Sequence, residues 1–308
     1  MIKDSSIQTP DWLLTKAEDT QQAFAVVLSL INERQQTVIE HCVTQHGVEL
    51  ESHVVMASHS EFRFAALSQT AWTLFQALLS RAMDAGFDVA IVPIAQRKKQ
   101  LLLCDMDSTI VSSETLDDIA AAIGIGEQVS QITAQAMRGE LDFKQALDAR
   151  VALLKGLPLT ALTDVIESIA LNPGAERLLT RCRQSGLRSV LVSGGFEPIV
   201  KHITEQLGFD RYVCNRMQVE EGKLSGRVQL PVVDSDTKLS VLKEECSKLN
   251  IKPEQACCIG DGANDLPMLQ HAGFGIGFHA KPIVNKTITY QINHSGLDFA
   301  LAMMGIAE

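Results

Sequence analysis

Short apolar runs alternate with longer helical stretches over most of this chain, from residue 100 to its end. The runs are LLLC (101–104), SVLVSGG (189–195), ACCIGDGAND (256–265) and, more weakly, GFGIGF (273–278). Fully apolar runs of this length are typical of strands that are buried on both faces in a parallel sheet. The pattern therefore predicts an α/β fold with a Rossmann-like parallel sheet whose strands end in small or acidic residues.

A long insertion separates the first predicted strand from the second. Residues 112–172 have helical character and no strand signal, and their length is sufficient for a helical cap. Further along, MQVEEGKLSGRVQL (217–230) combines alternation with glycines, which predicts a β-hairpin. We therefore expect a parallel-sheet core with a helical cap inserted after its first strand.

The first 95 residues have a different organisation. QTAWTLFQALLSRAMDAG predicts an amphipathic helix that ends at Gly86, and the strand candidates are AFAVVLSLI, HVVMA, EFRFAAL and FDVAIVPI. If the first of these runs pairs as a strand, the element order is βαββαβ. The polar segment AQRKKQ (95–100) marks the best boundary, so we expect a small N-terminal α/β domain at 1–97 and a second domain at 98–308.

Composition and charge argue against several classes of function for this chain. Its 308 residues are 46% hydrophobic and 21% charged, which allows a sizeable core. The formal net charge of -10 argues against nucleic acid and anionic membrane as partners. No apolar run reaches the roughly 18 residues of a membrane span. Seven cysteines without a CxxC pair, and no secretory signal, predict a reduced, cytoplasmic protein.

Four aspartates follow the predicted strands directly: Asp105, Asp107, Asp261 and Asp265. A single aspartate at such a position is usually a cap or turn residue. Because parallel strands end at one edge of their sheet, however, several acids there are expected to lie together. Hard oxygen ligands of this kind suit Mg²⁺, so Asp105, Asp107 and Asp261 are candidate metal ligands.

Asp105 and Asp107 also have the chemistry of phosphoryl transfer. A carboxylate at Asp105 can attack phosphorus and form an aspartyl-phosphate. Asp107 can protonate the leaving oxygen and later deprotonate the attacking water, which requires the two carboxyls to hold different protonation states. Thr109 has two interpretations, as a hydroxyl that orients the second carboxyl or as an ordinary helix cap.

Groups that bind an anion follow later in the chain. The triplet Ser193–Gly195 precedes a helix that Pro198 opens, and it offers a hydroxyl and open backbone N–H groups. Lys238 stands at the start of an amphipathic helix. Such triplets are common turns and most lysines are surface residues, so these two features gain weight only from the acids that accompany them.

The motifs occur in the order found in the haloacid dehalogenase superfamily of phosphatases. The chain has DMDST at Asp105–Thr109, then Ser193–Gly194, Lys238, and GDGANDLPML at Gly260–Leu269. Within the superfamily it resembles the phosphoserine phosphatase family, which carries a glutamate after DMDST and a helical cap. The matching positions here are Glu114, Met137, Phe143 and Arg150.

This resemblance, which covers roughly residues 100–300, implies a specific reaction. It implies Mg²⁺-dependent hydrolysis of O-phospho-L-serine to L-serine and phosphate, the last step of serine biosynthesis, with Asp105 as nucleophile and Asp107 as acid/base. Asp107 would bind Mg²⁺ through its backbone carbonyl. The implied phosphate-binding residues are Ser193, Gly194, Lys238 and Asn264, and the implied supporting residues are Thr109, Gly195 and Asp265.

The chemical groups of phosphoserine explain why these residue types would occur in the cap. Glu114 can pair with the ammonium of phosphoserine, and Arg150 offers a planar fork for its carboxylate. Phe143 and Met137 can cover the site and exclude water. Without the resemblance, an exposed ion pair for Arg150 and helix packing for the two apolar residues are the simpler interpretations.

Other functions stay open at this stage. A sibling phosphatase or phosphotransferase for another small phosphomonoester, such as phosphohomoserine, would share the core, since one methylene changes binding by only about 1–3 kcal/mol. A sensor with a vestigial phosphatase site is a third hypothesis, although every charged part is present. The N-terminal element order resembles ACT-type amino-acid-binding domains, so this domain is expected to regulate the enzyme or to mediate formation of a homodimer.

Overall fold

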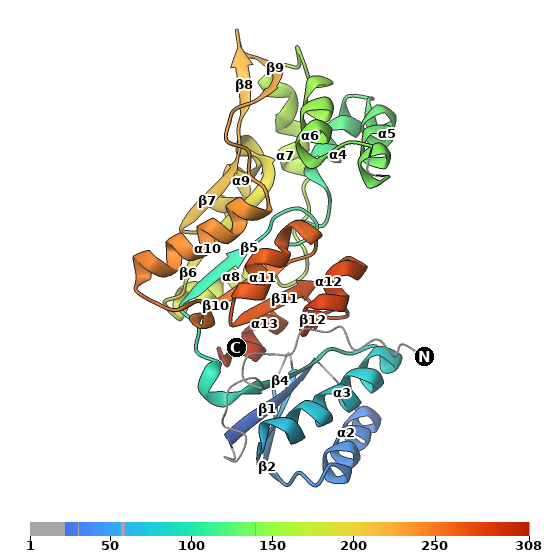
Figure 1. The fold of residues 1–308 in the computed structure, drawn as a ribbon, viewed down its shortest axis with the longest axis vertical. Coiled ribbons are helices and arrows are strands. Elements are labelled where there is room, and N and C mark those ends of the chain that lie inside the picture. Colours follow the sequence, from blue (N-terminus) through green and yellow to red (C-terminus); the bar gives the residue numbers. More distant parts are fainter. Residues whose placement is uncertain (1–21, 30, 57–58, 139, 308) are drawn as a thin grey trace.

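The computed structural model describes residues 22–29, 31–56, 59–138 and 140–307, apart from the side chains of Met83, Met137, Phe143 and Asp164. It contains an N-terminal antiparallel sheet, a parallel-sheet core and a cap at the opposite end from the N-terminal sheet (Figure 1). Within the described ranges, no helix has both the length and the apolar character needed to cross a membrane.

From residue 22 onward, the N-terminal unit has the predicted βαββαβ order. Its elements are β1 (Gln22–Ser29), α2 (Glu33–Gln45), β2 (Leu50–Val55), β3 (His59–Ala66), α3 (Ser68–Ala85) and β4 (Val89–Pro93). The first apolar run does pair as a strand, because β1 lies between β3 and β4 in the antiparallel order β2-β3-β1-β4. Gly86 ends α3 in the left-handed region, at φ 72, where glycine has no steric penalty.

Strand β1 is apolar on both faces because each face packs against a different layer. Phe24 and Val26 belong to the cluster formed with α2 and α3. Ala25 and Val27 alternate with them and belong to the cluster of the large core. The N-terminal sheet therefore packs directly on the rest of the protein.

The predicted polar boundary does not form a solvated linker. Arg97 and Lys99 are 6% and 4% exposed. The Arg97 guanidinium lies 2.8 Å from Glu61 in β3, and it donates to the carbonyl of Met303 near the end of the chain. This segment thus ties the N-terminal sheet to the core.

The core is a six-stranded parallel sheet in the order β12-β11-β10-β5-β6-β7. Its strands are β5 (Leu101–Cys104), β6 (Arg188–Phe196), β7 (Arg211–Asn215), β10 (Ala256–Gly260), β11 (Phe274–Phe278) and β12 (Tyr290–Ile292). The four predicted strands are confirmed. The edge strands β7 and β12 were missed, since β7 is mostly half-buried and β12 has only three residues, so neither forms a long apolar run.

Helices cover both faces of the parallel sheet. The elements are α8 (Ala175–Gln184), α9 (Glu197–Leu207), α10 (Ser235–Leu249), η3 (Pro253–Gln255), η4 (Ala263–Asp265), α11 (Leu266–His271), α12 (Pro282–Thr287) and α13 (Phe299–Met304). Residues of α8, α9 and α13 share one apolar cluster with alternate positions of β5. Residues of α10, α11 and α12 share another with the remaining positions. This two-sided burial explains the continuous apolar strands.

The predicted helical cap is confirmed. It consists of α4 (Thr115–Ala122), α5 (Gly126–Met137), α6 (Phe143–Ala152), η2 (Leu159–Ala161) and α7 (Leu162–Ser168). Its two connections to the core pair with each other through a bridge between Val111 and Leu171, and Asn172 donates to the carbonyls of Thr109 and Val111. A short stem with hydrogen bonds between its two segments therefore joins the cap to the core.

The predicted hairpin is also confirmed, and it extends the cap. Its strands are β8 (Met217–Glu220) and β9 (Lys223–Val228). Leu224 exchanges backbone hydrogen bonds with the end of the α6 segment, accepting from Gly156 and donating to Leu157, both at 2.8 Å. Two segments distant in sequence thus form one layer above the sheet (Figure 1).

Candidate active site

Asp105 is the first residue after β5 and lies at the carboxyl-terminal edge of the sheet. The ammonium of Lys238 lies 2.7 Å from its Oδ1 atom and 2.6 Å from Oδ1 of Asp265. Lys238 comes from the first turn of α10, and Asp265 from the loop after β10. The structure therefore brings together three predicted residues from distant segments.

The buried carboxylates carry more negative charge than the neighbouring lysines balance. Burial and the charge of Asp265 raise the pKa of the Asp105 carboxyl well above its usual range, although Lys238 opposes the rise. Burial also raises the pKa of Asp261, against the effect of Lys281. A further cation among these oxygens would remove the imbalance.

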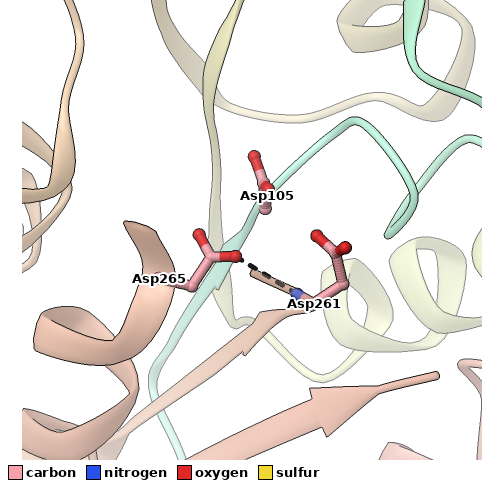
Figure 2. Close-up of side chains that lie close together, drawn as sticks. All are labelled: Asp105, Asp261 and Asp265. Atoms are coloured by element: carbon pink, nitrogen blue, oxygen red, sulfur yellow. Dashed lines mark hydrogen bonds between the residues drawn. The ribbon is translucent and has the colours of Figure 1, made fainter. Parts of the chain in front are cut away.

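The carboxylates of Asp105, Asp261 and Asp265 have the arrangement of a metal site. Each offers an oxygen, and these atoms lie within 4.8 Å of one another. Figure 2 shows the three carboxylates directed to the same side of the sheet edge. Asp265 is already engaged, since its Oδ2 atom accepts from the N–H groups of Asp261 and Gly262. The donor set fits a hard cation bound chiefly by Asp105 and Asp261.

Asp107 is held in a different environment from Asp105. Its Oδ1 atom accepts from the backbone N–H of Thr115 at 2.9 Å, and its Oδ2 atom accepts from the Ser193 hydroxyl at 3.2 Å. Burial raises the pKa of the Asp107 carboxyl, and the hydrogen bonds from Thr115 and Ser193 offset this only in part. Two neighbouring carboxyls thus have distinct partners, as an acid/base pair requires. The buried hydroxyl of Thr109 has no hydrogen-bond partner among the described residues.

The predicted anion-binding triplet lies in an irregular part of β6. The strand continues through Phe196, but its register with β7 shifts between Val192 and Phe196. The N–H of Gly195 donates to the Ser193 hydroxyl at 2.8 Å. A Cβ atom on Gly195 would lie 2.8 Å from Cε of Met106, 3.0 Å from Oγ of Ser193 and 3.2 Å from Oδ2 of Asp107, so a larger residue there would force these side chains to shift.

Asn215 is a supporting residue that sequence reasoning missed. It is buried at the end of β7, donates to the carbonyl of Gly194 and accepts from the N–H of Val233, both at 2.8 Å. A lone asparagine at an edge strand carries no local signal. Its importance depends on the loops that meet there.

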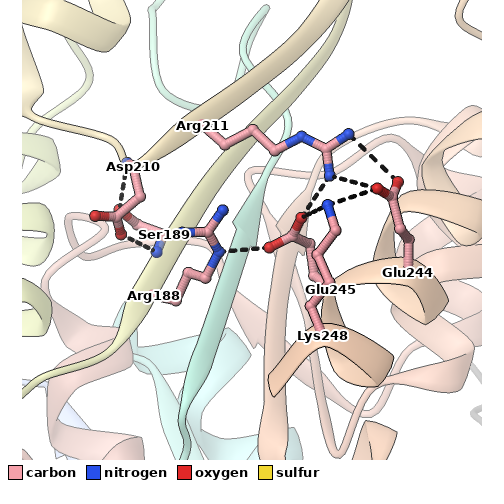
Figure 3. Close-up of polar contacts among 7 residues, drawn as sticks. All are labelled: Arg188, Ser189, Asp210, Arg211, Glu244, Glu245 and Lys248. Carbon is pink, nitrogen blue, oxygen red and sulfur yellow. Dashed lines mark hydrogen bonds and ion pairs between the residues drawn. The ribbon is translucent and has the colours of Figure 1, made fainter. Parts of the chain in front are cut away.

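Helix α10 is anchored at the opposite edge of the sheet from Lys238. Glu245 is fully buried on α10 and binds Arg188, Arg211 and Lys248 (Figure 3). Arg188 and Arg211 are the first residues of β6 and β7. Helix α10 thus carries the ion pairs of Glu245 toward one end and the site lysine, Lys238, toward the other.

A second missed residue, Lys281, lies beside Glu114. Glu114 precedes α4, is exposed, and accepts from the Ser108 hydroxyl at 3.1 Å. The ammonium of Lys281 lies 3.1 Å from Oδ2 of Asp261 and 3.5 Å from Oε1 of Glu114. Its position in the sequence could have identified Lys281 as a site residue, because it follows the predicted strand GFGIGF just as the acids follow their strands.

Two of the remaining predicted residues whose side chains the structure describes, Arg150 and Asn264, form no hydrogen bond or ion pair with these carboxylates. Arg150 is half-buried in the last turn of α6, where its Nε atom donates to the Ala146 carbonyl at 3.3 Å. Asn264 is exposed beside Gly262. Met137 is the last residue of α5 and Phe143 the first of α6, and their side chains lie outside the described residues.

Comparison with known proteins gives a consistent result. Residues 102–270 match the model of the haloacid dehalogenase-like hydrolase family. The chain is 43% identical over 199 residues to a phosphoserine phosphatase of Lactococcus lactis, which covers 65% of this chain and 92% of that protein. It is 38% identical over 222 residues to a phosphoserine phosphatase of Archaeoglobus fulgidus, covering 71% of this chain but only 64% of that protein, less than two thirds of its length.

A solved structure extends this likeness to three dimensions. The structure of a phospho-aspartyl intermediate analogue of phosphoserine phosphatase superimposes with a TM-score of 0.62 at 40% identity. The match covers 67% of this chain and 98% of that one.

Proposed function

Because this chain belongs to the haloacid dehalogenase-like hydrolases, and within them to the phosphoserine phosphatase family, we propose that it hydrolyses O-phospho-L-serine to L-serine and phosphate. The reaction would complete serine biosynthesis. The observation that carries the proposal is the meeting of Asp105, Asp261 and Asp265 at one edge of the sheet, where Lys238 lies between Asp105 and Asp265.

Asp105 is the proposed nucleophile. Its carboxylate attacks phosphorus, the bond to the serine oxygen breaks, and an aspartyl-phosphate forms. Lys238 supports this step by holding the carboxylate at 2.7 Å and by offering positive charge to the phosphoryl oxygens. Water then attacks phosphorus, which releases phosphate and regenerates Asp105.

Asp107 is the proposed acid and base. Its raised pKa favours the protonated form that the leaving serine oxygen needs. After the proton has been given up, the same carboxylate accepts a proton from the attacking water. The N–H of Thr115 and the hydroxyl of Ser193 fix its orientation through both steps.

Phosphate and metal share the same sheet edge. Ser193, Gly194, Lys238 and Asn264 are proposed to bind the phosphoryl oxygens, with Gly195 and Asp265 in support. Asp105, Asp261 and the backbone carbonyl of Asp107 would hold Mg²⁺. When bound, this ion supplies positive charge that neutralises the carboxylates and the phosphoryl group.

The cap is proposed to select the amino acid. Glu114 would bind the ammonium and Arg150 the carboxylate of phosphoserine, while Met137 and Phe143 would close over them. An extra methylene would change the fit by about 1–3 kcal/mol, so phosphohomoserine is the competing substrate to compare. The paired stem around Asn172 is the natural hinge for the cap to open and close.

We also propose that residues 1–97 form a regulatory or dimerising domain that packs on the catalytic domain at 98–308. All seven cysteines are free, which supports a reducing compartment such as the cytoplasm. Calorimetric titration of the full chain with serine separates sensing from scaffolding. The competition uses the Asp105→Asn variant, which should not hydrolyse phosphoserine. Heat that is competed away by phosphoserine would assign the binding to the active site, and heat that persists would assign it elsewhere.

The activity is tested by phosphate release from phosphoserine with MgCl₂. The Asp105→Asn variant should lose at least about 10³-fold in kcat, because the amide cannot act as the nucleophile. Hydroxylamine trapping should detect an acyl-phosphate in the native protein and none in Asp105→Asn. Asp84→Asn, at an exposed position on α3, is the matched control and should behave as the native protein does. Near-normal hydrolysis by Asp105→Asn would overturn the proposal.

A further inference from the structure

Lys281 occupies a third loop at the catalytic edge of the sheet. It follows β11 and directly precedes α12, and β11 is the neighbour of β10. The backbone N–H of Lys281 donates to the carbonyl of Asp261 at 2.8 Å. The position of this lysine relative to Asp261 is therefore fixed by the main chain as well as by its side chain.

The side chain of Lys281 links two carboxylates that have different proposed partners. Its ammonium lies 3.1 Å from Asp261, a proposed metal ligand, and 3.5 Å from Glu114, the proposed ligand of the substrate ammonium. Asp261 is buried, with a side chain 6% exposed, whereas the side chains of Glu114 and Lys281 are 51% and 57% exposed. The contact with Asp261 is thus the stronger one, and the contact with Glu114 is easily exchanged.

The other site lysine cannot have this role. Lys238 is 1% exposed and lies between Asp105 and Asp265, which hold it on both sides. Lys281 instead has access to solvent on one side and to two carboxylates on the other. It can leave Glu114 without leaving any buried charge unpaired.

We propose that Lys281 is a specificity-determining residue. In the resting site its ammonium occupies the place of two cations, the metal ion beside Asp261 and the substrate ammonium beside Glu114. It neutralises Asp261 before the metal binds, and it neutralises Glu114 until an α-ammonium displaces it. This rests on the proposed function of Glu114 and Asp261. Lys281 therefore weakens metal binding. It also keeps a positive charge beside Glu114, which allows the site to bind substrates that lack an ammonium.

The metal arm of the test needs no catalysis. The protein is stripped with EDTA and titrated with MgCl₂ by calorimetry in the absence of substrate. Replacing the lysine by methionine removes one positive charge near the ion, so Lys281→Met should bind Mg²⁺ about tenfold more tightly. Lys281→Arg should keep the native affinity. Lys201→Met, which removes a lysine that is also 57% exposed but lies on α9 beside Glu205, is the matched control and should also bind as the native protein does.

The substrate arm compares phosphoserine with 3-phosphoglycerate, which carries a hydroxyl where phosphoserine carries the ammonium. In Lys281→Met, KM for phosphoserine should fall or stay constant and KM for 3-phosphoglycerate should rise, so that discrimination in kcat/KM increases severalfold. Lys281→Arg should restore the native ratio. Equal or weaker Mg²⁺ binding by Lys281→Met, or a higher KM for phosphoserine, would overturn the proposal. If the native protein does not hydrolyse phosphoserine at all, the proposed function fails, while the metal arm still tests the effect of Lys281 on Asp261.

Discussion

The ammonium nitrogen of Lys238 lies 2.7 Å from Oδ1 of Asp105, and both residues are almost completely buried. Burial opposes the charge of Lys238, but the carboxylates of Asp105 and Asp265 raise its pKa above its usual value. The lysine therefore stays charged at neutral pH, and it serves as a counter-ion of the site.

Removing this counter-ion should damage both stability and activity. Lys238→Met leaves Asp105 and Asp265 buried without their shared partner, so we expect a loss of about 3–5 kcal/mol in the free energy of unfolding. The rate of phosphoserine hydrolysis should fall by at least about 10³-fold, because the variant lacks a charge that stabilises the transition state. Urea unfolding and initial rates measure the two effects. Lys243→Met, on the exposed face of the same helix, should change neither; a stable Lys238→Met protein would contradict the role given to the buried pair.

Gly195→Ala should impair catalysis more than folding. Its Cβ atom would lie 2.8 Å from the Met106 side chain, 3.0 Å from Ser193 Oγ and 3.2 Å from Asp107 Oδ2, so the acid/base residue must shift. We expect kcat to fall about 10²-fold with a stability loss of about 1–3 kcal/mol. At the neighbouring Gly194 the nearest atom is the Val233 carbonyl oxygen at 4.0 Å, so Gly194→Ala should lose less in kcat. Equal losses for the two variants would show that crowding at Asp107 is not the cause.

Glu245 should make the protein sensitive to acid. Burial opposes its charge, yet hydrogen bonds from Arg188, Arg211 and Lys248 lower its pKa to about 2 from 4.5. Since the folded pKa lies below the unfolded one, this stabilisation is complete above pH 4.5 and is lost as the pH falls towards 2.

The matching variant is Glu245→Gln. It should reduce the free energy of unfolding by about 2 kcal/mol at pH 7, because the partly exposed arginines can regain water. The difference from the native protein should narrow as the pH is lowered from 5 to 3, as measured by urea unfolding at each pH. Glu244→Gln, at the adjacent and 46% exposed position, should cost less than about 1 kcal/mol. A difference that is constant with pH would exclude the ionised Glu245 as its source.

Asp88 should control how the N-terminal sheet is attached to the core. Its carboxylate is buried and accepts from the backbone N–H groups of Asn293, His294 and Ser295, at 2.7 Å for the first and last. Asp88→Ala leaves these donors without an acceptor, so we expect a loss of about 2–3 kcal/mol.

The loss should be concentrated at the contact between the two sheets. In Asp88→Ala, urea unfolding should separate into two transitions, and limited proteolysis should cut near residues 95–100 sooner than in the native protein. Asp84→Ala, at an exposed position on α3, controls for loss of charge. A single transition at the native midpoint would mean that Asp88 does not hold the two sheets together.

Local pattern was sufficient for most of the fold. The runs at 101–104 and 256–260 became central strands because a strand buried on both faces must be continuously apolar. The cap between residues 112 and 172 was visible as helical periodicity without a strand signal. The edge strands β7 and β12 were not visible, since a half-buried or three-residue strand produces too short a pattern.

The sequence by itself determined which residues end the buried strands, and thus that Asp105, Asp107 and Asp261 share one edge. That inference needs only the direction of parallel strands. The tertiary structure decided which cation meets which carboxylate: Lys238 between Asp105 and Asp265, and Lys281 between Asp261 and Glu114. Such pairings depend on the order of strands in the sheet and on how each helix packs against it. Contacts between distant segments set both, and no local pattern in the chain records them.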